Sequence, residues 1–134
     1  MAIRLQIALP ATTDILRRAR EEVVTIAETD GAAKSVTDEV QLAVNEAVTN
    51  VLRHAYANGE GTLELGVGSN GHELTVVVRD WGKGFDPTHE GLGLRIIARC
   101  TKRYMIAASP GGGTEVVMTF DLRPGDEHPA GSQS

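Results

Sequence analysis

The sequence has little of what would direct a chain to nucleic acid, a membrane or an oxidising compartment. Among its 134 residues Cys100 is the only cysteine, which excludes an internal disulfide. Aromatic residues make up 4%, and 13 basic residues stand against 18 acidic ones, so we expect no direct nucleic-acid binding. The sequence lacks both the run of about twenty apolar residues that a membrane helix needs and an export leader. We therefore expect a cytoplasmic protein whose partners are proteins or small molecules.

What is present suits a single folded domain. Hydrophobic residues make up 41% of the chain, enough for a sizeable core at this length. Residues 123–134 are rich in proline, glycine, serine and charge, and they show no apolar periodicity. We therefore predict one domain over residues 1–122, followed by a disordered tail over residues 123–134.

The spacing of apolar residues predicts five strands and three helices. The expected elements are a strand at Arg4–Leu9, helices at Asp14–Glu28 and from about Ser35 to Ala55, strands at Thr62–Val67 and Glu73–Arg79, a helix at Leu92–Cys100, and strands at Tyr104–Ala108 and Glu115–Leu122. This order predicts an α+β fold, a two-layer sandwich with helices on one face of a mainly antiparallel sheet.

Local signals support these boundaries. Thr12 and Thr13 are candidate caps for the first helix, Gly31 marks its end, and Ser35–Asp38 offers caps for the second. The dipeptide at positions 70–71, Asn-Gly, is the strongest short signal for a hairpin between two strands.

The second expected helix carries a polar line. Glu46 and Asn50 are four residues apart, so they lie one turn apart on the same helical face and can reach one ligand. His54 lies another turn along. Taken alone, this line is also compatible with an ordinary solvated helix face.

Two glycine-rich segments follow the central strands. Asp80–Gly84 comes directly after a strand, where glycines permit close approach of a ligand and an aspartate accepts hydrogen bonds, although a tight turn has the same pattern. Gly91–Gly93 opens a helix, and the free amides of a helix start form an anion site that suits phosphate. A flexible glycine connection is the alternative for this second segment.

Taken in order along the chain, these segments resemble the motifs of the superfamily of gyrase, histidine-kinase and MutL ATPases. The segments are Glu46–Asn50, Asp80–Gly84, Gly91–Gly93 and the pair Gly113-Thr114. Within that superfamily, Asn45–Ala55 is similar to the anti-sigma-factor serine kinases. The resemblance covers roughly residues 5–122 and implies a Bergerat-type ATP-binding fold.

The resemblance also implies site residues for Mg-ATP. It makes Glu46 the general base, Asn50 the Mg²⁺ ligand, and Asp80 the acceptor for the adenine amino group. The asparagine role agrees with the preference of Mg²⁺ for hard oxygen ligands. The other residues implied to bind the nucleotide are His54, Gly82, Gly84, Gly91, Leu92, Gly93 and Thr114.

The function implied by the resemblance is partner switching. Such a protein binds Mg-ATP, restrains a sigma factor, and phosphorylates serine or threonine of a STAS-type anti-sigma antagonist protein. Family analogy also suggests a homodimer. Only six residues, Phe85–Glu90, separate the two glycine segments, whereas kinases of this family have a longer loop over the triphosphate. Two alternatives therefore stay open: a nucleotide-binding adapter without kinase activity, and a detached ATPase domain of a sensor system.

Overall fold

The fold is a sheet covered on one face by helices. The computed structural model describes residues 1–55, 61–82, 92–108 and 111–124. Its elements are β1 (Ala2–Pro10), α1 (Ile15–Thr29), α2 (Lys34–Asn50), the π-helix η1 (Val51–Ala55), β2 (Thr62–Ser69), β3 (Glu73–Asp80), α3 (Leu92–Cys100), β4 (Arg103–Ala108) and β5 (Thr114–Asp121). The predicted α+β sandwich is confirmed.

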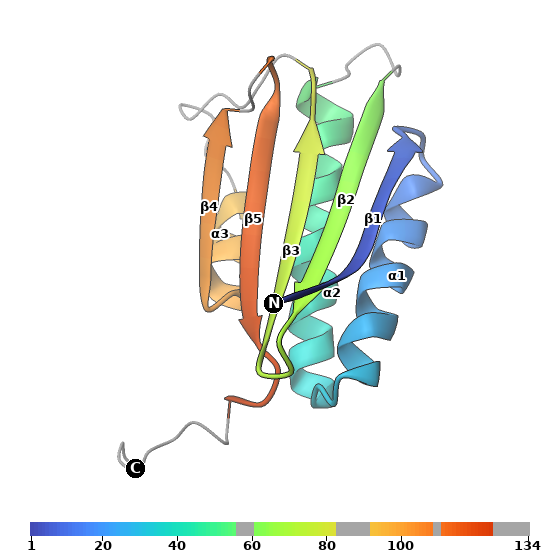
Figure 1. Ribbon diagram of the computed structural model, residues 1–134. Helices are drawn as coiled ribbons and strands as arrows, with labels where there is room; N and C mark the ends of the chain where they lie inside the picture. Colours follow the sequence, from blue (N-terminus) through green and yellow to red (C-terminus); the bar gives the residue numbers. More distant parts are fainter. Residues whose placement is uncertain (56–60, 83–91, 109–110, 125–134) are drawn as a thin grey trace.

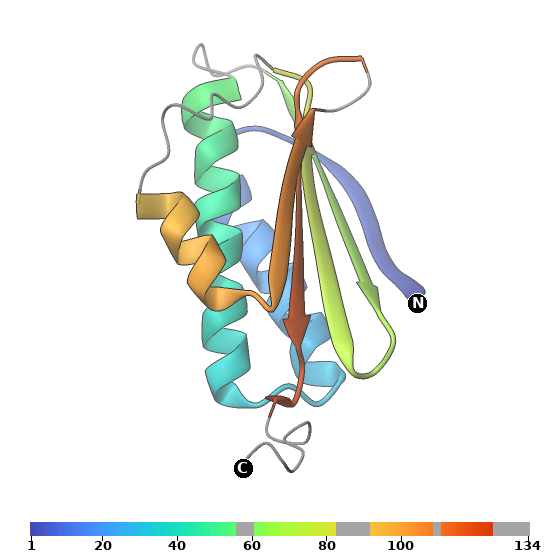
Figure 2. The same ribbon diagram turned by 90° about the vertical axis from the view of Figure 1, so that its left-hand side faces the viewer.

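The sheet has the strand order β1-β2-β3-β5-β4, and all four neighbouring pairs are antiparallel. All three α-helices lie behind this sheet in Figure 1, and Figure 2 shows them together on one side of it. Among the residues that the structure describes, no helix covers the opposite face of the sheet, and none is long and apolar enough to cross a membrane.

The core forms between the two layers because apolar residues alternate along the strands and recur along the helices. In β3, Leu74, Val76 and Val78 are buried toward the helices, while the residues between them are only half-buried. In α2, Val40 and Val44 are fully buried on the face toward the sheet. Residues 123–124 are exposed, and residues 125–134 of the expected tail lie outside the described part.

The end of α1 follows the prediction at Gly31. This glycine has a φ of +90°, its N–H donates to the Glu28 carbonyl at 3.0 Å, and the N–H of Ala32 donates to the Ala27 carbonyl at 3.0 Å. This is a Schellman arrangement, in which a residue with positive φ lets the chain turn back and satisfy the last carbonyls of the helix.

The predicted helix caps are wrong. Asp14 precedes α1 and Ala33 precedes α2, and neither makes a side-chain capping hydrogen bond. The second helix begins at Lys34, one residue before the expected caps. The Thr37 hydroxyl is inside the first turn and donates to the Lys34 carbonyl at 2.9 Å, so it does not accept from a free amide.

The prediction of one continuous α-helix to Ala55 is also corrected. The α-helical hydrogen bonding ends at Asn50, and the chain continues through Val51–Ala55 as a π-helix. Because a π-helix places more residues in each turn, the expected one-turn spacing from Asn50 to His54 does not apply to the backbone there. Such π-segments are uncommon and occur frequently beside functional sites.

The predicted hairpin between β2 and β3 is confirmed. Gly71 has a φ of +87°, and the Asn70 side-chain oxygen accepts hydrogen bonds from the amides of His72 and Glu73 at 2.9 and 2.7 Å. The asparagine side chain therefore satisfies the turn backbone, and it fixes the register in which the two central strands pair.

Candidate functional site

The predicted site residues come from elements that meet at one end of the sheet. The C-terminal half of α2, the end of β3 and the start of β5 all lie at the upper end in Figure 1. The first turn of α3 packs beside α2. Antiparallel pairing of β3 with β5 places the last residue of one strand beside the first residue of the other.

Glu46 and Asn50 lie on the same face of α2, as their four-residue spacing predicted, and that they bind one ligand stays a prediction. Both side chains are half-buried, and both point toward Gly93 in the first turn of α3. A methyl group added at Gly93 would lie 2.7 Å from Oε1 of Glu46 and 3.9 Å from Oδ1 of Asn50. The missing side chain therefore lets the start of a helix, with its free amides, approach a carboxylate and an amide oxygen.

Asp80 is the last residue of β3, and its carboxylate is buried, with 4% of the residue's surface exposed. The Gly82 amide donates to its Oδ1 at 2.9 Å, and the Thr114 amide also donates to the carboxylate. Burial raises the pKa of the Asp80 carboxyl above its ordinary value, and these two hydrogen bonds partly offset the rise. A buried carboxylate in this setting can accept a further hydrogen bond from the amino group of a base.

Gly113 lies directly against the Asp80 backbone. It has a φ of +87°, and a methyl group added to it would overlap the Asp80 carbonyl oxygen and would lie 2.6 Å from the Cα of Trp81. Thr114, the next residue, is buried at the first position of β5. The sequence alone shows three consecutive glycines here, and it does not indicate that the third one contacts Asp80.

Trp81 follows Asp80 and was not identified from the sequence. It is 41% exposed, and the Arg79 guanidinium lies 5.0 Å from the centroid of its ring. At this distance the quadrupole of the aromatic ring attracts the cation, which favours this arrangement of the two side chains. Trp81 is the only tryptophan of the chain, so its fluorescence reports on this end of the sheet.

Some predicted site residues cannot be placed. Gly84, Gly91 and the short segment Phe85–Glu90 lie outside the described residues. Leu92 is the first residue of α3. His54 is in the π-helix, and its side chain lies outside the described part.

Comparison with known proteins decides the family. Residues 9–120 match the family described as Histidine kinase-like ATPase domain. The chain belongs to this family. The family takes in almost all of the elements described above, and it confirms the resemblance drawn from the glycine motifs.

Two relatives of this ATPase domain are an anti-sigma factor and a serine-protein kinase by name. The anti-sigma F factor of Thermoanaerobacter sp. (strain X514) is 28% identical over 108 residues, which cover 69% of this chain and 75% of the relative. The serine-protein kinase RsbW of Oceanobacillus iheyensis is 28% identical over 83 residues, 61% of this chain and 52% of the relative. The chain therefore spans about half of that kinase.

A solved structure shares the fold of this ATPase domain. The RsbU and RsbW domains of Rv1364c from Mycobacterium tuberculosis match with a TM-score of 0.70 and 25% identity. The match covers 88% of this chain and 32% of the other, so about two thirds of that longer protein has no counterpart here.

The described residues fit the nucleotide that an ATPase family implies. A buried carboxylate with an acceptor to spare suits the amino group of adenine. At the other side of the site, glycine at position 93 leaves the start of α3 open beside Glu46 and Asn50. Helix-start amides suit phosphate, and an asparagine oxygen suits Mg²⁺.

Proposed function

We propose that this protein is an anti-sigma regulatory factor with serine/threonine kinase activity. In this proposal it binds Mg-ATP, restrains a sigma factor, and phosphorylates an antagonist protein that would otherwise release that factor. The observation that carries the proposal is the convergence of Glu46 and Asn50 on Gly93, in a family whose relatives include anti-sigma factors and serine-protein kinases.

Each residue has a chemical task in this proposal. Asp80 accepts a hydrogen bond from the adenine amino group, with Gly82 and Thr114 holding its carboxylate. Asn50 offers its side-chain oxygen to Mg²⁺, and the amides at the start of α3 face the phosphates. The remaining proposed nucleotide contacts are His54, Gly84, Gly91 and Leu92.

ATP supplies the phosphoryl group, and the protein supplies position and a base. Glu46 takes the proton from a serine or threonine hydroxyl of the antagonist as that oxygen bonds to the terminal phosphorus and the bond to ADP breaks. Its half-buried position beside Gly93 leaves the carboxylate partly accessible from outside the protein.

The proposal extends to partners and organisation. We propose a STAS-type antagonist, a homodimer, a cytoplasmic location and a single domain over residues 1–122 followed by a tail. The names of the relatives support the sigma-factor part, because anti-sigma F factor is among them.

One observation favours a second candidate. The six residues of Phe85–Glu90 form a shorter connection than expected for a cover over the triphosphate. A short cover excludes less water and makes fewer contacts with the terminal phosphate. The second candidate is therefore an adapter that binds nucleotide, restrains its partner, and transfers no phosphoryl group.

The test compares two asparagines on the same helix. Asn50→Ala removes the proposed Mg²⁺ ligand, whereas Asn45→Ala makes the same chemical change where the side chain accepts from Arg20 of α1 at 3.4 Å. Calorimetric titration with ATP, with and without Mg²⁺, should show that Asn50→Ala weakens Mg-ATP binding by about tenfold or more, or about 1.4 kcal/mol. Asn45→Ala should stay near wild type.

Equal Mg²⁺-dependent affinity in wild type and folded Asn50→Ala would contradict the metal assignment. The kinase part is tested with labelled ATP and the proteins captured from the native cytoplasm with and without Mg-ATP. Transfer of label to a captured antagonist supports the kinase, and nucleotide-dependent capture without transfer supports the adapter.

A further inference from the structure

The contact between Gly113 and Asp80 is closer than a turn requires. Three glycines in succession have positive φ, +85° at Gly111, +108° at Gly112 and +87° at Gly113. A side chain at either of the first two would meet nothing within 4 Å. A methyl group at Gly113 would overlap the carbonyl of Asp80. Positive φ alone therefore explains glycine at the first two positions, and the third has an additional reason.

The additional reason is the close approach of the start of β5 to the end of β3. The β3–β5 register pairs Arg79 with Glu115, so the next step toward the end of the sheet sets Asp80 beside Thr114. The Thr114 amide donates to the Asp80 carboxylate there. Because Gly113 directly precedes this amide, any side chain at 113 would push the start of β5 away from β3 and remove the donor.

We propose that Gly113 is a positioning residue of the base site. Its bare Cα lets β5 close onto the end of β3, so that the Thr114 amide orients the Asp80 carboxylate toward an amino group of the base. This inference rests on the proposed adenine-binding function. It assigns to Gly113 the preference for adenine over guanine nucleotides, which carry a carbonyl where adenine carries its amino group.

Orientation matters here because a carboxylate offers its lone pairs in fixed directions. The Gly82 amide already takes Oδ1 at 2.9 Å, and the Thr114 amide supplies the second restraint. With both in place the plane of the carboxylate is fixed, and so are the directions of its remaining acceptor sites. With the second restraint lost, the buried carboxylate can rotate, and an acceptor that rotates discriminates poorly between an amino group and a carbonyl.

The experiment compares Gly113→Ala with Gly111→Ala, which has nearly the same positive φ but open space around it. Alanine is strained by a similar positive φ at both positions, so a difference between the two variants reports the contact with Asp80. The ratio of ATP to GTP affinity is measured by titration, with Trp81 fluorescence as the signal, and Asp80→Asn is the reference for lost selectivity.

We expect Gly113→Ala to lower the ATP-to-GTP affinity ratio by about tenfold or more, or about 1.4 kcal/mol, and Gly111→Ala to keep the wild-type ratio. A general loss of stability would weaken both nucleotides together and leave the ratio unchanged. An unchanged ratio in folded Gly113→Ala would overturn the inference. A wild-type protein that binds neither nucleotide would instead overturn the proposed function.

A second measurement needs no variant, which matters if Gly113→Ala does not fold. In NMR spectra of the wild-type protein, saturating ATP should shift the amide resonances of Gly113 and Thr114, and saturating GTP should shift them less. Gly111 should respond little to either nucleotide. Equal responses of Gly113 and Thr114 to the two nucleotides would contradict a role in base selection.

Discussion

At the scale of single residues, the site holds two carboxylates in different environments. Asp80 is buried, held by two backbone amides, and its pKa is raised by burial. Glu46 is half-buried and lies against a helix start. One environment suits a fixed hydrogen-bond acceptor, and the other leaves a carboxylate partly accessible from outside the protein.

The proposed role of Glu46 as the general base predicts that its loss slows phosphoryl transfer and leaves nucleotide binding largely unchanged. Glu46→Gln keeps the size of the side chain but removes the proposed base, so single-turnover phosphorylation of the proposed antagonist should fall by about 10²–10⁴-fold. Nucleotide affinity should change by much less. The rate is measured at saturating Mg-ATP, after both proteins are shown to be folded.

Glu39→Gln is the matched control for this variant. It lies two turns earlier on α2 and makes the same charge change on an exposed side chain. Similar transfer rates in wild type and Glu46→Gln would reject Glu46 as the base.

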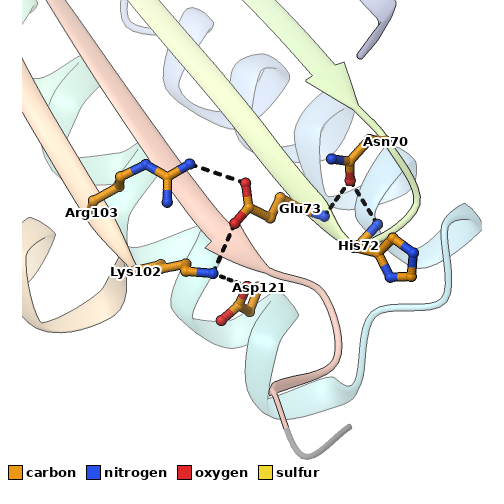
Figure 3. A network of polar contacts seen from close by, with 6 residues as sticks. All are labelled: Asn70, His72, Glu73, Lys102, Arg103 and Asp121. Atoms are coloured by element: carbon orange, nitrogen blue, oxygen red, sulfur yellow. Dashed lines mark hydrogen bonds and ion pairs between the residues drawn. The ribbon is translucent and has the colours of Figure 1, made fainter. Parts of the chain in front are cut away.

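At the scale of elements, the two ends of the sheet differ: one carries the candidate site, and the other carries a network of ion pairs. The end opposite the candidate site is tied by a polar network (Figure 3). Lys102 donates to Glu73 at 2.8 Å and to Asp121 at 3.1 Å, and Arg103 donates to Glu73 at 3.1 Å. These contacts join β3, β5 and the start of β4 at the end of the sheet opposite the candidate site. They therefore help to hold the register in which these three strands pair.

This network predicts a pH-dependent contribution to stability. The hydrogen bond from Lys102, supported by Arg103, holds the pKa of Glu73 below its ordinary value of 4.5. The stabilisation is therefore fully present above that value and is lost as the pH falls through the lowered folded-state pKa. Glu73→Gln should reduce the free energy of unfolding at neutral pH by less than about 1 kcal/mol, because the partners are partly exposed.

Urea unfolding of wild type and Glu73→Gln across this pH range checks the prediction. The difference between the two proteins should shrink as the pH falls. Glu21→Gln, an exposed change on α1, should show no such trend. A difference that grows toward acid pH would contradict the assigned direction.

At the scale of the whole molecule, one end of the two-layer fold gathers the proposed ligand contacts. They come from α2, β3, β5 and α3, which lie far apart in the sequence (Figure 1). A ligand that bridges these elements binds the folded chain and not the unfolded one, so it stabilises the whole domain.

Mg-ATP should therefore raise the unfolding temperature. At a free concentration about one hundred times Kd, the added stability is about 2.7 kcal/mol, which corresponds to a rise of several degrees for a domain of this size. Differential scanning fluorimetry measures the shift. Mg-GTP should produce a smaller rise at the same concentration, and no shift with Mg-ATP at any concentration would contradict nucleotide binding.

The sequence by itself determined the order of the elements, the layer architecture and the shared helical face of Glu46 and Asn50. Periodicity is a local property, so alternation in β3 and the four-residue spacing of Glu46 and Asn50 can be read without the fold. The hairpin at Asn70-Gly71 and the end of α1 at Gly31 could also be predicted from local sequence. Each turn needs a residue with positive φ, and glycine adopts that conformation without strain.

Only the tertiary structure decided what those residues face. The convergence on Gly93 and the overlap that a side chain at Gly113 would make with Asp80 both depend on atoms that folding brings together from distant parts of the chain. The change from α-helix to π-helix after Asn50 escaped prediction, because helical propensity does not distinguish the two hydrogen-bonding patterns. The predicted caps of α2 failed because the helix begins one residue earlier, with Ala33 at its N-cap position, so that Ser35 falls inside the first turn.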